Sequence, residues 1–324
     1  MKDKKVLLEA ENLVKEFPLA NGRKGSNVVH AVSNVNLKIY EGETLALVGE
    51  SGCGKSTLGR TLIRLLEATS GSIRYEGRVI TGMKDKEFKD IRRQMQIIFQ
   101  DPYASLNPRM NVREIISEPL VTYGLAKTRA EIDAQVKALM EEVGIPREFI
   151  GRYPHQFSGG QRQRIGIARA IALNPRLIIC DEPVSALDVS IQSQVLNLLK
   201  DLQEQYQLTY LFISHDLSVV KFIADRVCVM FLGMVCEVGD TEAIYEKPLH
   251  PYTRFLLNAI PKADPRLRSQ EAELLTGEIP SPVNPPAGCR FHTRCPYGKE
   301  ICRQKVPEGT LVGERQVFCH FPLV

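Results

Sequence analysis

The stretch Gly49-Glu50-Ser51-Gly52-Cys53-Gly54-Lys55-Ser56-Thr57 decides the fold, because it satisfies the phosphate-loop pattern G-x-x-x-x-G-K-[ST]. Ahead of it runs Thr44-Leu45-Ala46-Leu47-Val48, an apolar run of the kind that is buried on both faces of a parallel sheet. Behind it, leucines recur at three- and four-residue spacing from Leu58 to Leu66, which predicts a helix that Thr69-Ser70-Gly71 ends. A phosphate loop between a strand and a helix predicts an α/β fold with a nucleotide site.

The residue types in this loop suit phosphate chemistry. Gly49, Gly52 and Gly54 lack side chains that would keep phosphate oxygens away from the backbone N–H groups, and the helix N-terminus adds positive potential. Lys55 is expected to reach the β- and γ-phosphates, and the Ser56 hydroxyl to ligate Mg²⁺. The alternative is a chance glycine-rich turn, which the flanking strand and helix disfavour.

The composition is that of a globular protein. Of the 324 residues, 44% are apolar and 25% are charged, which argues against disorder. The net charge of +4 is modest and the basic residues form no block, so nucleic acid is not expected as the main ligand. The sequence has no uninterrupted apolar run of transmembrane length, and Met1-Lys2-Asp3-Lys4-Lys5 does not lead into a signal-peptide core. We therefore expect a soluble cytoplasmic chain whose membrane role, if it has one, passes through partners.

Strands dominate the first part of the chain. Apolar and polar residues alternate between Leu7 and Ile39, which predicts short strands of a half-solvated antiparallel sheet. Phe17 either stacks on a base or packs beneath that sheet, and its position alone favours packing. Further along, the predicted strand Gln96–Phe99 ends at Gln100.

A helical insertion follows, from about residue 101 to residue 173. Within it, Thr128 and Glu131 form a predicted capping box, and Gly144 is expected to end the helix. Near its end, Ser158-Gly159-Gly160-Gln161 begins another helix. Two glycines at a helix N-terminus predict a second anion site, although such a start is more often only a cap.

Polar residues follow two predicted buried strands. Leu177–Cys180 leads to Asp181 and Glu182, and Tyr210–Ile213 leads to His215. Ligands of open α/β sheets gather at the carboxyl ends of strands, so Asp181 is expected to reach Mg²⁺, Glu182 to face a γ-phosphate and His215 to bond a phosphate. The alternatives are acids that cap a helix and a structural histidine.

These motifs, in this order from Leu7 to Val238, resemble the ATP-binding subunits of ABC transporters. The resemblance implies a RecA-like P-loop core of the α/β class, with an antiparallel β-subdomain and an inserted α-helical subdomain. It places adenine on Phe17, which reverses the preference for packing. It also assigns Walker A to Gly49–Thr57, the Q-loop to Gln100, the signature motif to Ser158-Gly159-Gly160-Gln161, Walker B to Asp181 and Glu182, the D-loop to Asp188, and the switch histidine to His215.

The family's mechanism implies a head-to-tail dimer that sandwiches two ATP molecules. Each nucleotide would lie between one chain's Walker A loop and the other chain's signature motif, so an isolated chain should hydrolyse ATP poorly. The catalytic residues would be Glu182, which polarises the attacking water, His215, which stabilises transferred charge, and Gln100, which acts through Mg²⁺ with Asp181. Dimer closure would be the power stroke.

Two further stretches resemble one subfamily. Residues 101–110, DPYASLNPRM, and residues 250–253, HPYT, look like the dipeptide and oligopeptide importers, whose relatives carry nickel. Residues 181–188, DEPVSALD, look like the second of their two paired ATPases, which implies a heterodimer with a homologous chain and allows a homodimer in isolation. The implied partners are two membrane permease subunits and, indirectly, an extracytoplasmic solute-binding protein. The implied location is the cytoplasmic face of the cell membrane.

The sequence divides into an ATPase domain over residues 1–245 and an extension over residues 246–324, in which four cysteines are spaced x5, x6 and x16. The resemblance implies a four-iron four-sulfur cluster there, while the residues themselves also allow zinc, or unligated thiols and disulfides. His292 or His320 could replace one ligand. The predicted ligands are Cys289, Cys295, Cys302 and Cys319.

Three rival classes fit less well. A ribosome-acting ABC protein should carry two cassettes, and this chain has one. A DNA-repair ATPase of the family would insert a long coiled coil between Gln100 and Ser158, where the interval is short and lacks sustained heptads. A phosphate-loop kinase would lack the motif at Ser158–Gln161.

Overall fold

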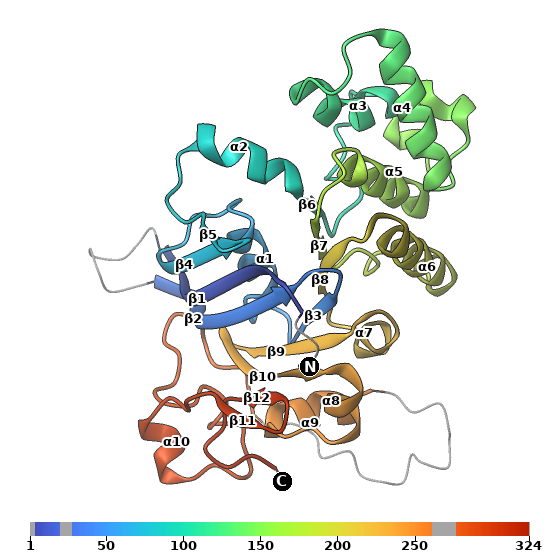
Figure 1. The fold of residues 1–324 in the computed structure, drawn as a ribbon. Coiled ribbons are helices and arrows are strands. Elements are labelled where there is room, and N and C mark those ends of the chain that lie inside the picture. The colour runs from blue at the N-terminus through green and yellow to red at the C-terminus, as the bar shows by residue number, and fades with distance from the viewer. Residues whose placement is uncertain (1–3, 20–27, 261–276, 324) are drawn as a thin grey trace. The chain divides into compact units, whose positions relative to one another are not determined.

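The computed structural model describes residues 4–19, 28–260 and 277–323, which form two compact units (Figure 1). The first unit comprises Met1–Gly82 and Phe212–Val324, and the second comprises Met83–Leu211. The extension therefore clusters with the N-terminal part of the chain, in the same unit as the phosphate loop. The strand β8 (Thr209–Ile213) contains the boundary between the two units.

An antiparallel sheet of the first unit has the strand order β2-β1-β4-β5 (Figure 1). The sequence predicted short strands before residue 40, whereas β1 and β2 are long, with 13 residues each. Several register shifts interrupt their pairing, and such bulges increase the local twist of long paired strands. The strands are β1 (Val6–Pro18), β2 (Val28–Tyr40), β4 (Ser70–Tyr75) and β5 (Arg78–Val79).

The strand that precedes the phosphate loop is β3 (Thr44–Val48), and all five of its residues are buried. It pairs in parallel with β9 (Arg226–Phe231). β9 and β10 (Met234–Asp240) form the hairpin that the sequence of residues 227–238 predicts, with Gly233 in the turn. On its other side β10 pairs with β12 (Arg315–Val317), followed by β11 (Thr310–Val312). The extension thus adds two strands to the sheet that carries the phosphate loop, which the sequence did not predict.

The first helix of this unit is shorter than predicted. It was expected to continue through Leu66, but α1 (Lys55–Leu62) ends earlier, and Leu65 is 51% exposed. Arg64 adopts a left-handed φ of 56°, and the N–H groups of Leu65 and Leu66 both turn back to the Arg60 carbonyl. The other helices are α7 (Leu217–Ile223), α8 (Thr241–Glu246), α9 (Pro251–Asn258) and α10 (Glu300–Gln304).

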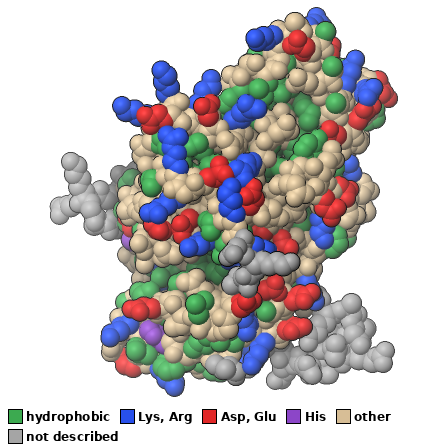
Figure 2. Space-filling view, viewed as in Figure 1, with side chains coloured by type: hydrophobic (Ala, Val, Ile, Leu, Met, Phe, Trp, Pro, Cys, Tyr) green, Lys and Arg blue, Asp and Glu red, His purple; other side chains and the backbone are tan. Residues whose placement is uncertain are grey.

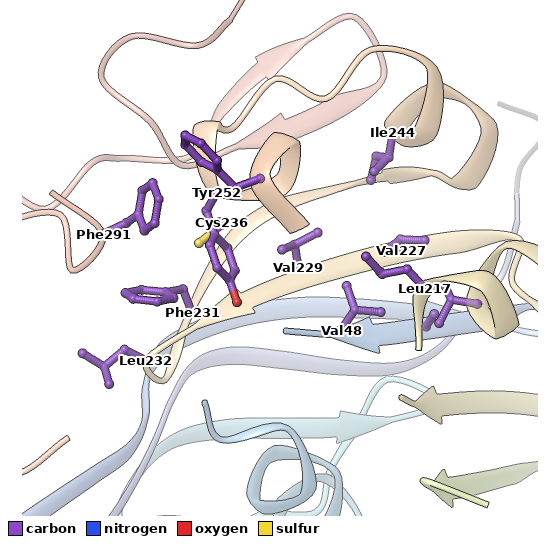
Figure 3. Packing of buried hydrophobic residues seen from close by; sticks show 13 residues of the cluster. Val48, Leu217, Val227, Val229, Phe231, Leu232, Cys236, Ile244, Tyr252 and Phe291 are labelled. Atoms are coloured by element: carbon purple, nitrogen blue, oxygen red, sulfur yellow. The ribbon is translucent and has the colours of Figure 1, made fainter. Parts of the chain in front are cut away.

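An aromatic cluster joins the extension to the strands of this unit. Phe291, 2% exposed, packs edge-on against Phe231 with ring centroids 5.3 Å apart, and lies 5.2 Å from the Tyr252 ring. Figure 3 shows these rings beside Cys236 and the apolar side chains of β9. Because aromatic side chains bury large apolar areas, this cluster gives the extension a core that it lacks alone.

The second unit contains the predicted helical insertion. Here β6 (Met95–Ile98), which lies one residue earlier than the predicted strand Gln96–Phe99, pairs in parallel with the buried strand β7 (Leu177–Asp181). Thr128 and Glu131 form the predicted capping box, and Gly144, with φ 70°, ends the helix. The helices are α2 (Asp85–Gln94), α3 (Val112–Thr122), α4 (Arg129–Glu142), α5 (Gly159–Ile171) and α6 (Val189–Tyr206), with 3₁₀ turns η1 (Arg147–Gly151) and η2 (Pro154–Gln156).

The described part of the chain has no helix that is both long enough and apolar enough to cross a membrane. On the face shown in Figure 2, Lys and Arg side chains are interspersed with Asp and Glu. This mixture agrees with the small net charge of +4.

Candidate functional site

The phosphate loop joins β3 to α1 and depends on two glycines. Gly49 has φ 150°, and a Cβ there would lie 2.1 Å from the Met230 carbonyl oxygen. Gly54 has φ 101°, and a Cβ there would lie 2.0 Å from the Ala31 carbonyl oxygen. Any larger residue would therefore clash with backbone as well as strain its own conformation. Neighbouring strands thus impose the loop's path on these two positions.

Lys55 points back into this loop. Its Nζ donates to the carbonyl oxygens of Gly49 at 2.8 Å and Glu50 at 3.0 Å, and the residue is only 5% exposed. The N-cap of α1 is Gly54, which offers no side chain to cap the helix. A positive helix end and an enclosed ammonium group therefore face the same short loop, which is the arrangement that binds phosphate.

Cys53 lies inside the loop, 4% exposed, with its Sγ 3.9 Å from Lys55 Nζ. Burial raises the pKa of this thiol, and the nearby Lys55 charge only partly opposes that effect. The thiol therefore stays protonated near neutral pH and fills space as a small apolar group.

In the second unit, the structure brings Gln100 and Glu182 together. Gln100 Nε2 donates to Glu182 Oε2 at 2.8 Å. Asp181, at the end of β7, is fully buried. Glu182 itself has φ 49°, and its carbonyl oxygen accepts from the Ser185 backbone N–H at 3.3 Å and from the Ser185 hydroxyl at 3.1 Å. A sharp turn at the strand end therefore sets the direction of the Glu182 carboxylate.

Ser158 and Gln161 form a reciprocal cap at the start of α5. Gln161 N donates to Ser158 Oγ at 3.3 Å, and Ser158 N donates to Gln161 Oε1 at 3.0 Å. At Gly160 a Cβ would lie 2.4 Å from Ile191 Cγ2, so this glycine lets α5 approach α6. In the single chain this motif therefore forms a helix cap, which was the alternative to an anion site. The sequence did not show that Gly160 is also required for the packing of α5 against α6.

Three other predicted site residues lie at or next to the ends of their elements. Phe17 is partly buried on β1 opposite Val29, and Lys15 Nζ lies 4.8 Å from its ring centroid. Asp188 is the N-cap of α6. His215 follows β8 and is exposed.

The predicted metal site of the extension does not form in the structure. All eight cysteines are free thiols, and no three His, Cys, Asp or Glu side chains in the described ranges are arranged to hold a metal ion. Backbone bonds hold this segment instead, because Cys289 N donates to the Cys302 carbonyl at 2.8 Å. The two candidate histidines also face backbone carbonyls, with His292 Nδ1 2.8 Å from Cys289 O and His320 Nε2 2.9 Å from Lys305 O.

Two residues of the extension reach the phosphate loop, and the sequence did not predict either contact. Arg294 pairs with the Glu50 carboxylate, with the shorter Nη1···O distance 2.8 Å, and Tyr252 Oη accepts from the Glu50 backbone N–H at 2.9 Å. Tyr252 belongs to the HPYT stretch that marks the subfamily, which is the only signal that could have drawn attention to it.

Comparison with known proteins agrees with this geometry. Residues 32–185 match the family model described as ABC transporter, and residues 236–302 match the one described as oligopeptide/dipeptide transporter, C-terminal region. The oligopeptide transport ATP-binding protein OppF of Salmonella typhimurium is 53% identical over 312 residues, which cover 95% of this chain and 93% of that protein. The chain belongs to the ABC transporter ATP-binding proteins.

Other relatives of this ABC ATPase have similar descriptions. The oligopeptide transport ATP-binding protein AppF of Bacillus subtilis is 52% identical, with 94% of each chain covered. The di/tripeptide transport ATP-binding protein DppF of Pseudomonas aeruginosa is 48% identical, with 97% of each covered. Among solved structures, the dimeric ATP-binding cassette MJ0796 bound to ADP and Pi matches with a TM-score of 0.65 and 30% identity, over 72% of this chain and 99% of that one.

Proposed function

We propose that this chain is the ATP-binding and ATP-hydrolysing subunit that energises a membrane-embedded importer of dipeptides and oligopeptides. The observation that carries the proposal is the combination of a phosphate loop with an extension that matches the oligopeptide/dipeptide transporter C-terminal region. The relatives described above are named for oligopeptides or di/tripeptides, which favours peptides over nickel or another solute as the cargo of this importer.

The proposed chemistry begins at the phosphate loop. Lys55 is expected to exchange its bonds with the loop carbonyls for bonds with the β- and γ-phosphates of ATP, while Phe17 stacks on adenine. Mg²⁺, held by the Ser56 hydroxyl and by Asp181, would neutralise charge on the phosphates. Asp181 suits this role chemically, since it is a fully buried carboxylate at a strand end.

Hydrolysis needs an ordered water as well as bound ATP. Glu182 is proposed to polarise that water, Gln100 to act through Mg²⁺ with Asp181, and His215 to stabilise the charge transferred. The 2.8 Å bond between Gln100 and Glu182 supports a shared role for the first two residues. The γ-phosphate would also contact the Ser158–Gln161 motif and the Asp188 loop of a second ATPase chain.

The second chain is proposed to be a homologous ATPase, with a homodimer possible in isolation. The MJ0796 cassette with ADP and Pi is a dimer, which supports the arrangement by analogy. The pair would act on two permease subunits at the cytoplasmic face of the cell membrane, and through them on an extracytoplasmic solute-binding protein. The proposed ATPase domain covers residues 1–245.

The test is peptide uptake by cells or proteoliposomes that contain the complete transporter, with this chain as the variable component. The wild-type chain should support uptake of a labelled tripeptide, and Lys55→Ala should abolish it. Uptake that continues without this chain would refute the transport role. Uptake of nickel in place of peptide would redirect the assignment to that metal.

An iron–sulfur cluster in the extension is a secondary proposal, and its support is the presence of four cysteines, the usual ligands of such clusters, within one segment of the chain. Burial raises the pKa of Cys289 to about 12 and that of Cys295 to about 11. Because iron binds thiolates, cluster binding would have to lower both pKa values, and no step of the proposed reaction passes through a cluster. Protein purified without oxygen should contain stoichiometric iron; stoichiometric zinc would favour the alternative metal, and metal-free, normally folded protein would refute both.

A further inference from the structure

Residues of the extension bind Glu50, the first variable residue of the phosphate loop. Arg294 Nη1 lies 3.1 Å from Glu50 Oε1 and 2.8 Å from Glu50 Oε2, although 244 residues separate the two in sequence. The Arg294 side chain is 6% exposed and the Glu50 side chain 22% exposed. A pair this sheltered is screened far less by solvent and salt than a surface ion pair.

A second contact fixes the backbone of the same residue. Tyr252 Oη accepts a hydrogen bond from Glu50 N at 2.9 Å. The Tyr252 ring is fully buried, 4.8 Å from the Phe231 ring centroid and 5.2 Å from that of Phe291, so its hydroxyl has little freedom to move. The side chain and the backbone of Glu50 are therefore both held by residues that lie beyond the ATPase core.

The extension also supports the other end of the loop. Arg290 donates to the Leu232 carbonyl and, through Nη2, to Ser33 Oγ at 2.9 Å. The next residue in that turn, Gly233, donates its N–H to the Cys53 carbonyl at 2.8 Å. Two arginines of one short segment of the extension therefore support the loop. Arg294 contacts Glu50 directly, and Arg290 acts on Cys53 through the turn at Leu232 and Gly233.

This geometry has an electrostatic consequence. Glu50 places a carboxylate in a loop that must accept the several negative charges of a nucleotide, and Lys55 bonds to the Glu50 carbonyl. An uncompensated carboxylate would repel phosphate and compete for Lys55. Arg294 neutralises that charge, and Tyr252 keeps the Glu50 N–H in place.

We propose that Arg294 and Tyr252 are positioning residues for the phosphate loop, through which the extension sets the affinity of this chain for nucleotide. The inference rests on the proposed ATP-binding function and adds a control of that site by the extension. The coupling between the extension and the nucleotide site is reciprocal, because nucleotide that stabilises the loop must in turn stabilise the extension.

The test is a double-mutant cycle with MgADP, which binds the loop without being hydrolysed. The full-length variants are Arg294→Gln, Glu50→Gln, their combination, and Tyr252→Phe, with affinity measured by calorimetry and unfolding temperature measured in parallel. Arg303→Gln is the matched control, since Arg303 lies in the same extension and is exposed. Lys55→Ala serves as the reference for loss of the nucleotide site itself.

We expect Arg294→Gln to weaken MgADP binding about fivefold or more, and the added Glu50→Gln to restore most of that loss by removing the uncompensated carboxylate. Tyr252→Phe should weaken binding with little change in unfolding temperature, because its ring still packs. Arg303→Gln should match the wild type. Wild-type affinity in Arg294→Gln, or additive losses in the double variant, would overturn the proposal.

Two further outcomes separate this inference from the function on which it rests. If Arg294→Gln does not fold, Tyr252→Phe decides alone, and unchanged MgADP affinity in that variant would overturn the inference. If Lys55→Ala binds MgADP as tightly as the wild type, the assignment of the nucleotide site fails instead.

Discussion

Gln100 Nε2 donates to Glu182 Oε2 at 2.8 Å, so a residue just after β6 holds the carboxylate at the end of the neighbouring strand β7. Glu182 has φ 49°, a region that costs a residue with a side chain about 1 kcal/mol or more. It also precedes Pro183, which narrows its choice of backbone angles further. Strain kept at a residue expected to act on water is consistent with a functional role for that conformation.

Glu182→Gln is predicted to separate binding from hydrolysis. The glutamine has nearly the same shape, so MgATP affinity should stay within about threefold of the wild type, while the loss of a general base should slow hydrolysis about 10²- to 10⁴-fold. ATP should then hold the dimer closed. Phosphate release and size-exclusion chromatography with ATP measure the two effects, and normal turnover would show that Glu182 is not the base.

Gln100→Ala is predicted to lower kcat about tenfold or more with a smaller effect on MgATP affinity, because it removes the amide that orients the Glu182 carboxylate. Steady-state ATPase assays on the assembled transporter measure both parameters. Gln96→Ala is the matched control, since the Gln96 side-chain amide donates to the carbonyls of Arg92 and Arg93 in the preceding helix. Equal losses in both variants would point to general destabilisation of β6.

Local sequence was sufficient to predict those elements whose pattern is complete within a few residues. The phosphate loop with its strand, the capping box at Thr128 and the hairpin around Gly233 all follow from local spacing, and the structure contains them. The predicted end of α1 was wrong, because Leu65 and Leu66 continue the apolar spacing although the chain leaves the helix at Arg64.

Features that depend on distant residues could not be predicted in this way. The strands β11 and β12 have three residues each, too few for a period, and β12 is placed by pairing with β10. The bond between Arg294 and Glu50 spans 244 residues, and neither residue stands out in its own stretch. The metal centre was implied by the family resemblance, and the four cysteines allowed it together with unligated thiols. Their spacing cannot show where the thiols point once the backbone has satisfied its own hydrogen bonds.

Phe291→Ala is predicted to destabilise the protein by about 3–5 kcal/mol, because it empties the centre of the aromatic cluster that joins the extension to β9. Urea unfolding measures the free-energy difference. Leu311→Ala, at a position 77% exposed in the same extension, should change stability by less than about 0.5 kcal/mol. A Phe291→Ala protein as stable as the wild type would mean that the extension does not contribute to the core of this unit.

Stability is also predicted to fall in mild acid because of His250. Burial lowers the pKa of this histidine to about 3 in the folded protein, from an ordinary value near 6.5. Its Nδ1 accepts from Tyr252 N at 3.0 Å, and its backbone N–H donates to the buried Glu237 carboxylate, which also pairs with Arg315. The unfolded chain therefore binds a proton that the folded chain excludes, and the free energy of unfolding decreases as the pH falls below about 6.5.

Between pH 6.5 and pH 5.5 this loss should amount to about 1 kcal/mol, measured by urea unfolding at each pH. His250→Asn should flatten the difference, because asparagine still caps α9 through its side-chain oxygen and carries no titrating group. His155→Asn, at an exposed histidine of the other unit, should leave the pH dependence of the wild type unchanged. If His250→Asn keeps the full pH dependence, the acid sensitivity arises from other groups, and the buried histidine does not control it.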